Sequence, residues 1–339
     1  MNHRGLLALY SAAHLWVDLS CALLMFRTVA GEGDFALCLL LYNFCAFALQ
    51  MPLGLLADRL DRNSAVAAGG CVLTALAYAV PNPLAVAVTA GVGNALFHLG
   101  GGIDVLNGSG RRAAALGIFV SPGALGLYLG TRWGRGTAPG LWIGPLGLLL
   151  LGTAILWGSR RALDGFRSGN APVELTPRGS YGPLLPLLVV VVLRSYMGMN
   201  QAFPWRGEGW WALGLTLALV LGKAAGGFAM DGFGPRRSAA WSLGLAAGLY
   251  LLCAMPLPGT LAVFLFNMTM PMTLWAAAQL LPGAKGFAFG LLTFGLFLGA
   301  LPSFLGWPSV LTGPLSYALA ALASLALLWR PLRKVVASC

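Results

Sequence analysis

The sequence contains few charged residues and very few acidic ones. Asp, Glu, Lys and Arg together make up 9% of its 339 residues, and only 10 residues are acidic. A soluble globular domain carries about 25% charged residues, so this chain cannot cover a folded surface with charge. Because 58% of the residues are hydrophobic and the mean hydropathy is +0.79, most of its surface must face lipid.

Motifs of soluble catalysis are also missing. The chain has no G-x-x-x-x-G-K-[ST] phosphate loop, no H-E-x-x-H zinc motif and no G-x-S-x-G nucleophile turn. Its six Cys residues include no C-x-x-C pair, and most lie within apolar runs, as small buried residues do. We therefore expect no enzymatic activity, no cofactor, no metal site and no use of ATP.

The chain does contain twelve apolar runs, each close to the roughly 20 residues that cross a bilayer core. The connections between them are short and often contain Pro and Gly. This pattern predicts an all-α membrane protein with twelve transmembrane helices, the first of them retained rather than cleaved. The predicted spans are residues 5–27, 35–56, 64–80, 84–106, 112–131, 141–157, 183–203, 209–230, 238–255, 259–281, 286–306 and 313–330.

One connection, residues 158–181, is long, polar and basic. It divides the chain almost evenly, which predicts an N-terminal six-helix bundle at 1–157 and a C-terminal six-helix bundle at 182–339, joined by a cytoplasmic linker. With a cytoplasmic N-terminus, fifteen of the 21 Lys and Arg residues fall in cytoplasmic segments and four in external ones. We expect a multi-pass protein of a bacterial inner membrane with both termini in the cytoplasm. The formal charge of +11 follows from this topology, so we expect no nucleic-acid partner.

A short motif occurs once in each predicted half, at the cytoplasmic end of the second helix. Each copy has a Gly, an Asp four residues later and then Arg, and the two copies are 173 residues apart. An internal repeat at half-chain spacing is typical of duplicated transporters. The residues are Gly54, Asp58 and Arg62 in the first copy, and Gly227, Asp231 and Arg236 in the second.

The repeated motif resembles the loop signature of the major facilitator superfamily, which implies two pseudo-symmetric six-helix bundles. The Gly would let two helices approach closely. The Asp would pair with Arg or with a helix N-terminus, holding the outward-facing state as a conformational gate. The first copy departs from the signature, because Asp61 stands where a Gly is expected and where the second copy has Gly234.

Four further segments resemble the fosmidomycin resistance protein group of that superfamily. They are residues 11–18, 97–98, 116–126 and 279–290. Members of that group look like proton-driven exporters of small drugs, so the resemblance implies efflux and drug resistance. Within the third segment, Ser121–Gly126 is similar to the Gly-Pro-rich antiporter signature, with Ser121 in place of a Gly; a Gly/Pro kink is expected there.

Ionisable residues at bilayer depth are costly and often functional. His14 and Asp18 share one helical face at i, i+4 and could exchange a proton in the physiological range, or could simply orient the first helix. Arg194, near the middle of the seventh run, must meet an anion, which could be substrate, Asp18 or another acid. His98 could contact substrate, carry a proton or pack. The remaining predicted substrate-binding residues are Asn43, Tyr196 and Asn267.

These observations favour a secondary active transporter that works by alternating access. We expect it to act as a monomer and to export a small polar or anionic compound in exchange for protons. An importer remains open, either a proton symporter or a carrier of a metal such as copper, because thioethers bind Cu(I). The Met residues in question are Met197, Met199, Met268, Met270 and Met272. A receptor or an intramembrane enzyme is a third possibility, but the loops are too short for an extra domain.

Overall fold

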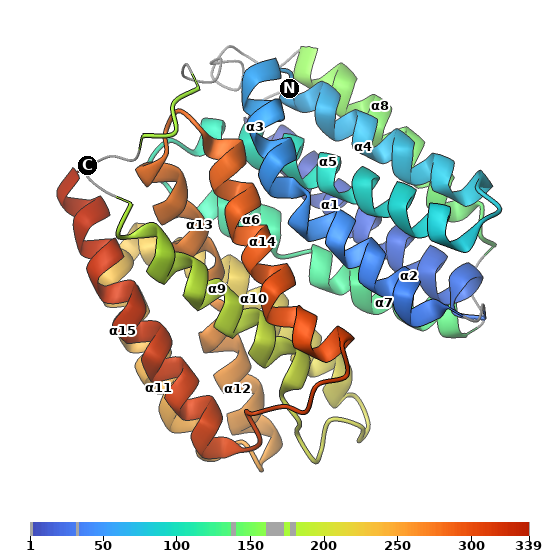
Figure 1. Ribbon diagram of the computed structural model, residues 1–339. Helices are drawn as coiled ribbons and strands as arrows, with labels where there is room; N and C mark the ends of the chain where they lie inside the picture. The colour runs from blue at the N-terminus through green and yellow to red at the C-terminus, as the bar shows by residue number, and fades with distance from the viewer. Residues whose placement is uncertain (1–2, 32–33, 137–139, 161–172, 177–180, 339) are drawn as a thin grey trace. The chain divides into compact units, whose positions relative to one another are not determined.

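The computed structural model describes residues 3–31, 34–136, 140–160, 173–176 and 181–338 (Figure 1). Regular structure in these residues is helical throughout. The predicted all-α fold is therefore confirmed. Most of the predicted linker, namely residues 161–172 and 177–180, lies outside the described residues, so the division of the chain at 158–181 stays a prediction.

The helices of the first half coincide with the first six predicted runs, and several are interrupted. They are α1 (His3–Leu24) with the π-turn η1 (Met25–Val29), α2 (Phe35–Asn43), η2 (Phe44–Ala48) and α3 (Gln50–Leu60), α4 (Asn63–Leu76) with η3 (Ala77–Ala79), α5 (Pro83–Ser109), α6 (Ala114–Val120) and α7 (Gly123–Arg135), and α8 (Ile143–Arg160).

The second half follows the other six runs. Its helices are α9 (Leu184–Asn200), α10 (Trp211–Phe233), α11 (Pro235–Tyr250), α12 (Pro256–Asn267) with α13 (Thr269–Leu280), α14 (Lys285–Phe304) and α15 (Pro314–Ser338). Within the described residues, nine helical stretches are long and apolar enough to cross a membrane, and two more are apolar but shorter. The chain is a multi-pass membrane protein.

Local chemistry explains several helix ends. Asn82 precedes α5, and its side-chain oxygen accepts a hydrogen bond from the Ala85 N–H at 3.0 Å, while Pro83 occupies the first helical position. The fifth predicted run breaks between α6 and α7 at Ser121–Pro122, since proline has no N–H to continue the helix. The kink expected from the Gly/Pro segment is thus present.

Internal contacts divide the chain into two compact units. Unit 1 comprises Met1–Gly110, Pro122–Glu174 and Gly283–Phe294, and unit 2 comprises Arg111–Ser121, Leu175–Pro282 and Gly295–Cys339. Each unit is therefore mainly one half of the sequence together with a short segment of the other. The start of α14 belongs to unit 1, and α6 belongs to unit 2. The break at Pro122 separates α6 from α7, which belongs to unit 1.

In unit 1, α4 packs between α5 and α8, and α1 packs against α5, α7 and α8 (Figure 1). The contact between α1 and α7 depends on glycine. A Cβ at Gly126 would overlap the carbonyl oxygen of Leu15, and a Cβ at Gly130 would overlap that of Leu19. These glycines therefore allow the two helix backbones to touch. In unit 2, α11 packs against α12 and α15, α10 against α6 and α12, and α9 against α13 and α15.

Residues 61 and 234 occupy equivalent positions in the two motif copies, and both have a positive φ. Asp61 ends α3 with φ 47°, and Gly234 precedes α11 with φ 81° and ψ 153°. Asp tolerates the left-handed region better than most residues, so the missing Gly of the first copy does not prevent the turn.

We expect Gly234→Ala to lower the free energy of unfolding by about 1–3 kcal/mol, because a residue with a Cβ is strained at that φ and ψ. The matched control is Gly232→Ala, two residues earlier at the end of α10, where no atom lies within 4 Å of a new Cβ. That change should be neutral or slightly stabilising. Thermal unfolding of the detergent-purified variants measures both, and equal melting temperatures would contradict the expectation.

Candidate functional site

The first motif copy forms a buried contact inside unit 1. The carboxylate of Asp58, which is 3% exposed, accepts hydrogen bonds from the backbone N–H groups of Gly286 at 2.8 Å and Phe287 at 2.9 Å. Both donors lie in the first turn of α14, where a helix attracts negative charge. A Cβ at Gly54 would overlap the Gly286 carbonyl, so this glycine lets α3 and α14 meet.

The second copy repeats this contact inside unit 2. Asp231 accepts hydrogen bonds from the backbone N–H groups of Ala113 at 2.7 Å and Ala114 at 3.1 Å, at the start of α6. Ala113 and Gly286 are 173 residues apart, the same spacing as the two Asp residues. A helix N-terminus, one of the two partners predicted for the motif Asp, is thus bound by both Asp58 and Asp231. A Cβ at Gly227 would again meet backbone, here the carbonyl group of Ala113.

The two motif Arg residues do not take part in these contacts. Arg62 is exposed in the turn between α3 and α4. Arg236, near the start of α11, places its guanidinium carbon 4.2 Å from the centre of the Trp329 ring, a cation–π contact. The Asp and Gly positions, and not the Arg positions, therefore carry the repeated geometry.

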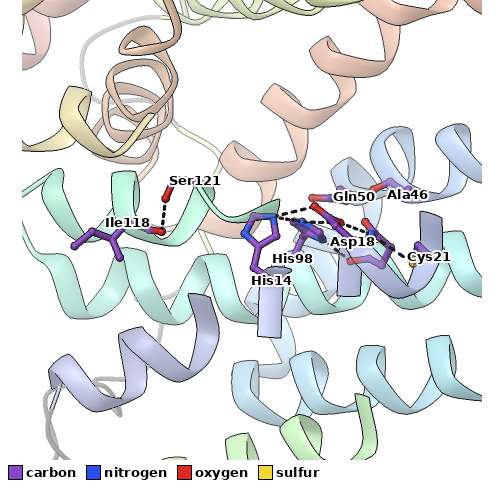
Figure 2. A network of polar contacts seen from close by, with 9 residues as sticks. His14, Asp18, Cys21, Ala46, Gln50, His98, Ile118 and Ser121 are labelled. Carbon is purple, nitrogen blue, oxygen red and sulfur yellow. Dashed lines mark hydrogen bonds and ion pairs between the residues drawn. The ribbon is translucent and has the colours of Figure 1, made fainter. Parts of the chain in front are cut away.

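The structure joins the predicted proton pair to His98. In unit 1, Nε2 of His14 lies 3.3 Å from Oδ2 of Asp18, and Nε2 of His98 lies 3.8 Å from Oδ1 of the same carboxylate. The two imidazole Nε2 atoms are 2.9 Å apart. Figure 2 shows the three side chains pointing toward one another. We call His14, Asp18 and His98 the histidine–aspartate cluster.

Hydrogen bonding assigns the proton positions in this cluster. Nδ1 of His98 lies 2.9 Å from the carbonyl oxygen of Asn94, which can only accept, so Nδ1 carries a hydrogen. In the neutral ring Nε2 then accepts, and Nε2 of His14 must donate to it. An added proton on His98 would reverse this bond and shift the His14 hydrogen to its other nitrogen. The cluster can therefore take up one proton beside a carboxylate.

Asn94 also belongs to the cluster and was not among the site residues predicted from the sequence. Its amide Nδ2 donates to Oδ1 of Asp18 at 2.9 Å, which orients the carboxylate. Its spacing from His98, four residues along α5, was the available signal. Gly123, the first residue of α7, also closes the cluster, because a Cβ there would overlap Oδ2 of Asp18 and Nε2 of His14.

Other titratable groups near the cluster come from the same helices and from α2. The Tyr10 hydroxyl of α1 donates to Oδ2 of Asp104 of α5 at 2.6 Å, and both side chains are buried. The Cys21 thiol lies 3.8 Å from Nδ2 of Asn94 and also faces Tyr42 of α2. Polar side chains thus line the contact between α1 and α5, from Asp104 past the histidine–aspartate cluster to Cys21.

We also considered whether the histidine–aspartate cluster could hold a metal ion. Within the described part of the chain, it is the group of three or more His, Cys, Asp or Glu side chains whose ligand atoms all lie within 4.8 Å of one another. Two nitrogens on a tetrahedral zinc lie ~3.3 Å apart, given Zn–N bonds of about 2.0–2.1 Å. The 2.9 Å between the imidazole nitrogens is shorter and matches a hydrogen bond. A shared proton describes this arrangement better than a metal.

Arg194 of α9 is buried in unit 2, with 7% of the residue exposed. Its Nη1 lies 3.5 Å from Oγ1 of Thr269 and 3.4 Å from Oγ1 of Thr273, both on α13. Among the described residues, no Asp or Glu side chain forms an ion pair with Arg194. Arg194 therefore has hydroxyl groups, and no described carboxylate, as its partners.

Comparison with known proteins identifies the architecture. No family model matches the sequence, and no curated protein matches it. Solved structures do match: the human organic anion transporter TETRAN has a TM-score of 0.68 at 16% identity, over 98% of this chain and 99% of that chain. The fucose:proton symporter of E. coli has a TM-score of 0.67 at 13% identity, over 98% of both chains. The chain has the major facilitator fold.

A bacterial homologue of the iron transporter ferroportin, in its outward-facing state, also matches, with a TM-score of 0.63 at 15% identity over 98% of both chains. Identities this low show the major facilitator fold alone. The narrower resemblance to the fosmidomycin resistance group therefore stays a prediction.

The other predicted substrate-binding residues form hydrogen bonds with backbone groups in this major facilitator fold. The amide groups of Asn43 and Asn267 each donate to the backbone carbonyl four residues earlier, at 2.8 Å. The Tyr196 hydroxyl accepts a hydrogen bond from the Val310 N–H at 2.9 Å. None of these bonds links them to the histidine–aspartate cluster or to Arg194, and their assignment to substrate stays a prediction.

Proposed function

We propose that this protein is a secondary transporter that works by alternating access in a bacterial inner membrane, with both termini in the cytoplasm. The major facilitator fold supports this proposal. The two Asp contacts support it as well, because each links a helix of one sequence half to a helix start from the other half. Asp58 holds the beginning of α14, and Asp231 holds the beginning of α6.

In this proposal the two contacts form the conformational gate, together with Gly54, Gly227 and the neighbouring Arg62 and Arg236. Each Asp stabilises two N–H groups that a helix leaves unbonded at its start. Because each glycine permits backbone contact, small shifts of either helix would break both hydrogen bonds at once. The gate would therefore open and close in discrete steps.

The histidine–aspartate cluster carries the proposal that transport is coupled to protons. The single observation behind it is the 2.9 Å contact between two imidazoles that share one carboxylate. An imidazole can bind and release a proton, so two imidazoles beside one carboxylate provide the groups that proton coupling needs. The Asp18 side chain is 21% exposed, compared with 6% for His14 and 10% for His98, which makes the carboxylate the accessible end.

The transported compound in this proposal is small and polar or anionic, it binds at Arg194, and it moves outward in exchange for protons. Arg194 is the reason for proposing an anionic compound. Its guanidinium is buried, and its two hydrogen bonds to hydroxyl groups are long. Export follows from the resemblance to drug exporters described above.

The test is transport by wild-type protein in liposomes. A thermal-shift screen at two pH values first identifies a ligand, which raises the melting temperature of the folded state. Liposomes loaded with that ligand are then diluted into acidic medium. Efflux should exceed that seen without a pH gradient by about tenfold or more. Accumulation of ligand inside the liposomes would show symport instead, and indifference to the gradient would refute proton coupling.

A further inference from the structure

We propose that unit 2 contains a binding site for one oxyanion group, a carboxylate or a phosphonate, formed by Arg194 and aligned by Thr269 and Thr273. This inference rests on the proposed transport function and deepens it by naming the substrate class. The two threonines are positioning residues, because they act through the guanidinium and not on the ligand.

Arg194 shares its face of α9 with buried apolar side chains. On the same face of α9 lie Val190, Val191 and Met197, each 0% exposed. A guanidinium keeps its charge in any protein environment and offers five N–H donors. Burying such a cation among apolar side chains is costly unless an anion offsets it. Thr hydroxyl groups carry no charge and cannot provide that offset.

The hydroxyl groups of Thr269 and Thr273 already donate to backbone carbonyl groups. The Thr269 hydroxyl donates to the carbonyl of Phe266 at 2.8 Å, and the Thr273 hydroxyl donates to the carbonyl of Met270 at 2.9 Å. Each hydroxyl proton is therefore committed, and each oxygen presents lone pairs to Arg194. The threonines are four residues apart on α13, so they share one helical face. Both oxygens lie near the same atom, Nη1.

The threonines contact one nitrogen of the Arg194 guanidinium, Nη1. With Nη1 directed to the threonines, the edge formed by Nε and Nη2 has no hydrogen-bond partner among the described residues. Two parallel N–H groups on one edge match two oxygens of a carboxylate or a phosphonate. A single cation in an apolar setting is balanced by one negative charge. The site therefore fits a monoanionic group and discriminates against the neutral amide of the same shape.

The experiment uses detergent-purified full-length protein at one pH, with benzoate and methylphosphonate as probes. Benzamide is the neutral match for benzoate, and sodium chloride keeps the ionic strength constant. We expect at least one oxyanion to raise the melting temperature of wild type by about 2 °C or more, with no rise for benzamide. Arg194→Met, which keeps the length of the side chain without its charge, should abolish that rise.

Arg194→Met also reports on the unliganded state. If the guanidinium lacks an anion, the variant melts at the same temperature as wild type in chloride or at a higher one, whereas loss of a structural ion pair would lower it. Arg206→Met, in an exposed turn, is the matched control and should leave the oxyanion response unchanged. The proposal is overturned if Arg194→Met melts lower, if benzamide acts like benzoate, or if neither oxyanion stabilises wild type.

The threonines are tested by titration of the stabilising oxyanion. Thr269→Val combined with Thr273→Val should weaken its Kd about tenfold, because the guanidinium loses both acceptors that align it. Thr269→Ser combined with Thr273→Ser keeps both hydroxyl groups and should restore Kd to within about twofold. A purely structural role would change the melting temperature in chloride while leaving Kd unaltered, and that result would remove the threonines from the site.

These assays need no membrane and no pH gradient. Oxyanion binding in a protein that shows no gradient-driven transport would refute proton coupling and leave the binding site intact. Gradient-driven transport of a neutral compound, without any oxyanion binding, would refute this site and leave the proposed transport function intact.

Discussion

Asp18→Asn is expected to reduce pH-gradient-driven transport about 100-fold or more while leaving ligand counterflow at equal pH largely intact. The amide keeps the shape of the side chain and can still accept the Asn94 hydrogen bond. It removes the charge that both imidazoles face at 3.3 and 3.8 Å. Without that charge a proton on His14 or His98 becomes a buried cation without an anion, so the loaded state is lost.

The measurement compares efflux from liposomes with and without an imposed pH gradient. Counterflow is the internal control, because exchange of labelled for unlabelled ligand requires alternating access but no net proton movement. Asp34→Asn, an exposed acid before α2, is the matched variant and should behave like wild type. Full gradient-driven transport by Asp18→Asn would show that the histidine–aspartate cluster is structural.

Gly126→Ala is expected to lower the free energy of unfolding by about 1–3 kcal/mol, the cost typical of overpacking. A methyl group at this position would overlap the Leu15 carbonyl, and backbone cannot move aside as a flexible side chain can. The change should therefore push α7 away from α1. Because Gly123 lies one turn earlier on α7 and contacts the cluster, we also expect weaker proton coupling.

The control for this substitution is Gly69→Ala in the middle of α4, where a new Cβ meets no atom within 4 Å. Alanine has the higher helix propensity, so Gly69→Ala should be neutral or slightly stabilising. Thermal unfolding in detergent gives both values. If Gly126→Ala melted at the wild-type temperature, the close contact between α1 and α7 would be wrong.

Several features of the site required the folded chain. Spacing along α1 placed His14 and Asp18 on one face, but it could not show that His98 meets them, because helical periodicity does not reveal which helices are neighbours. The same limit hid Asn94 and Gly123. For Arg194 the sequence required an anion and left substrate, Asp18 or another acid open. The structure places two threonines of α13 beside it instead.

The positions of the helices and the repeated motif could be predicted from the sequence alone. The length of an apolar run is a local property that must match the bilayer thickness. The spacing of 173 residues between the motif copies can be read directly from the sequence. The folded chain was needed to show that each motif Asp binds a helix N-terminus. It was also needed to show that α6 and the start of α14 join the unit formed mainly by the other half. Such contacts involve backbone groups distant in sequence from the Asp, and backbone N–H groups carry no sequence signature.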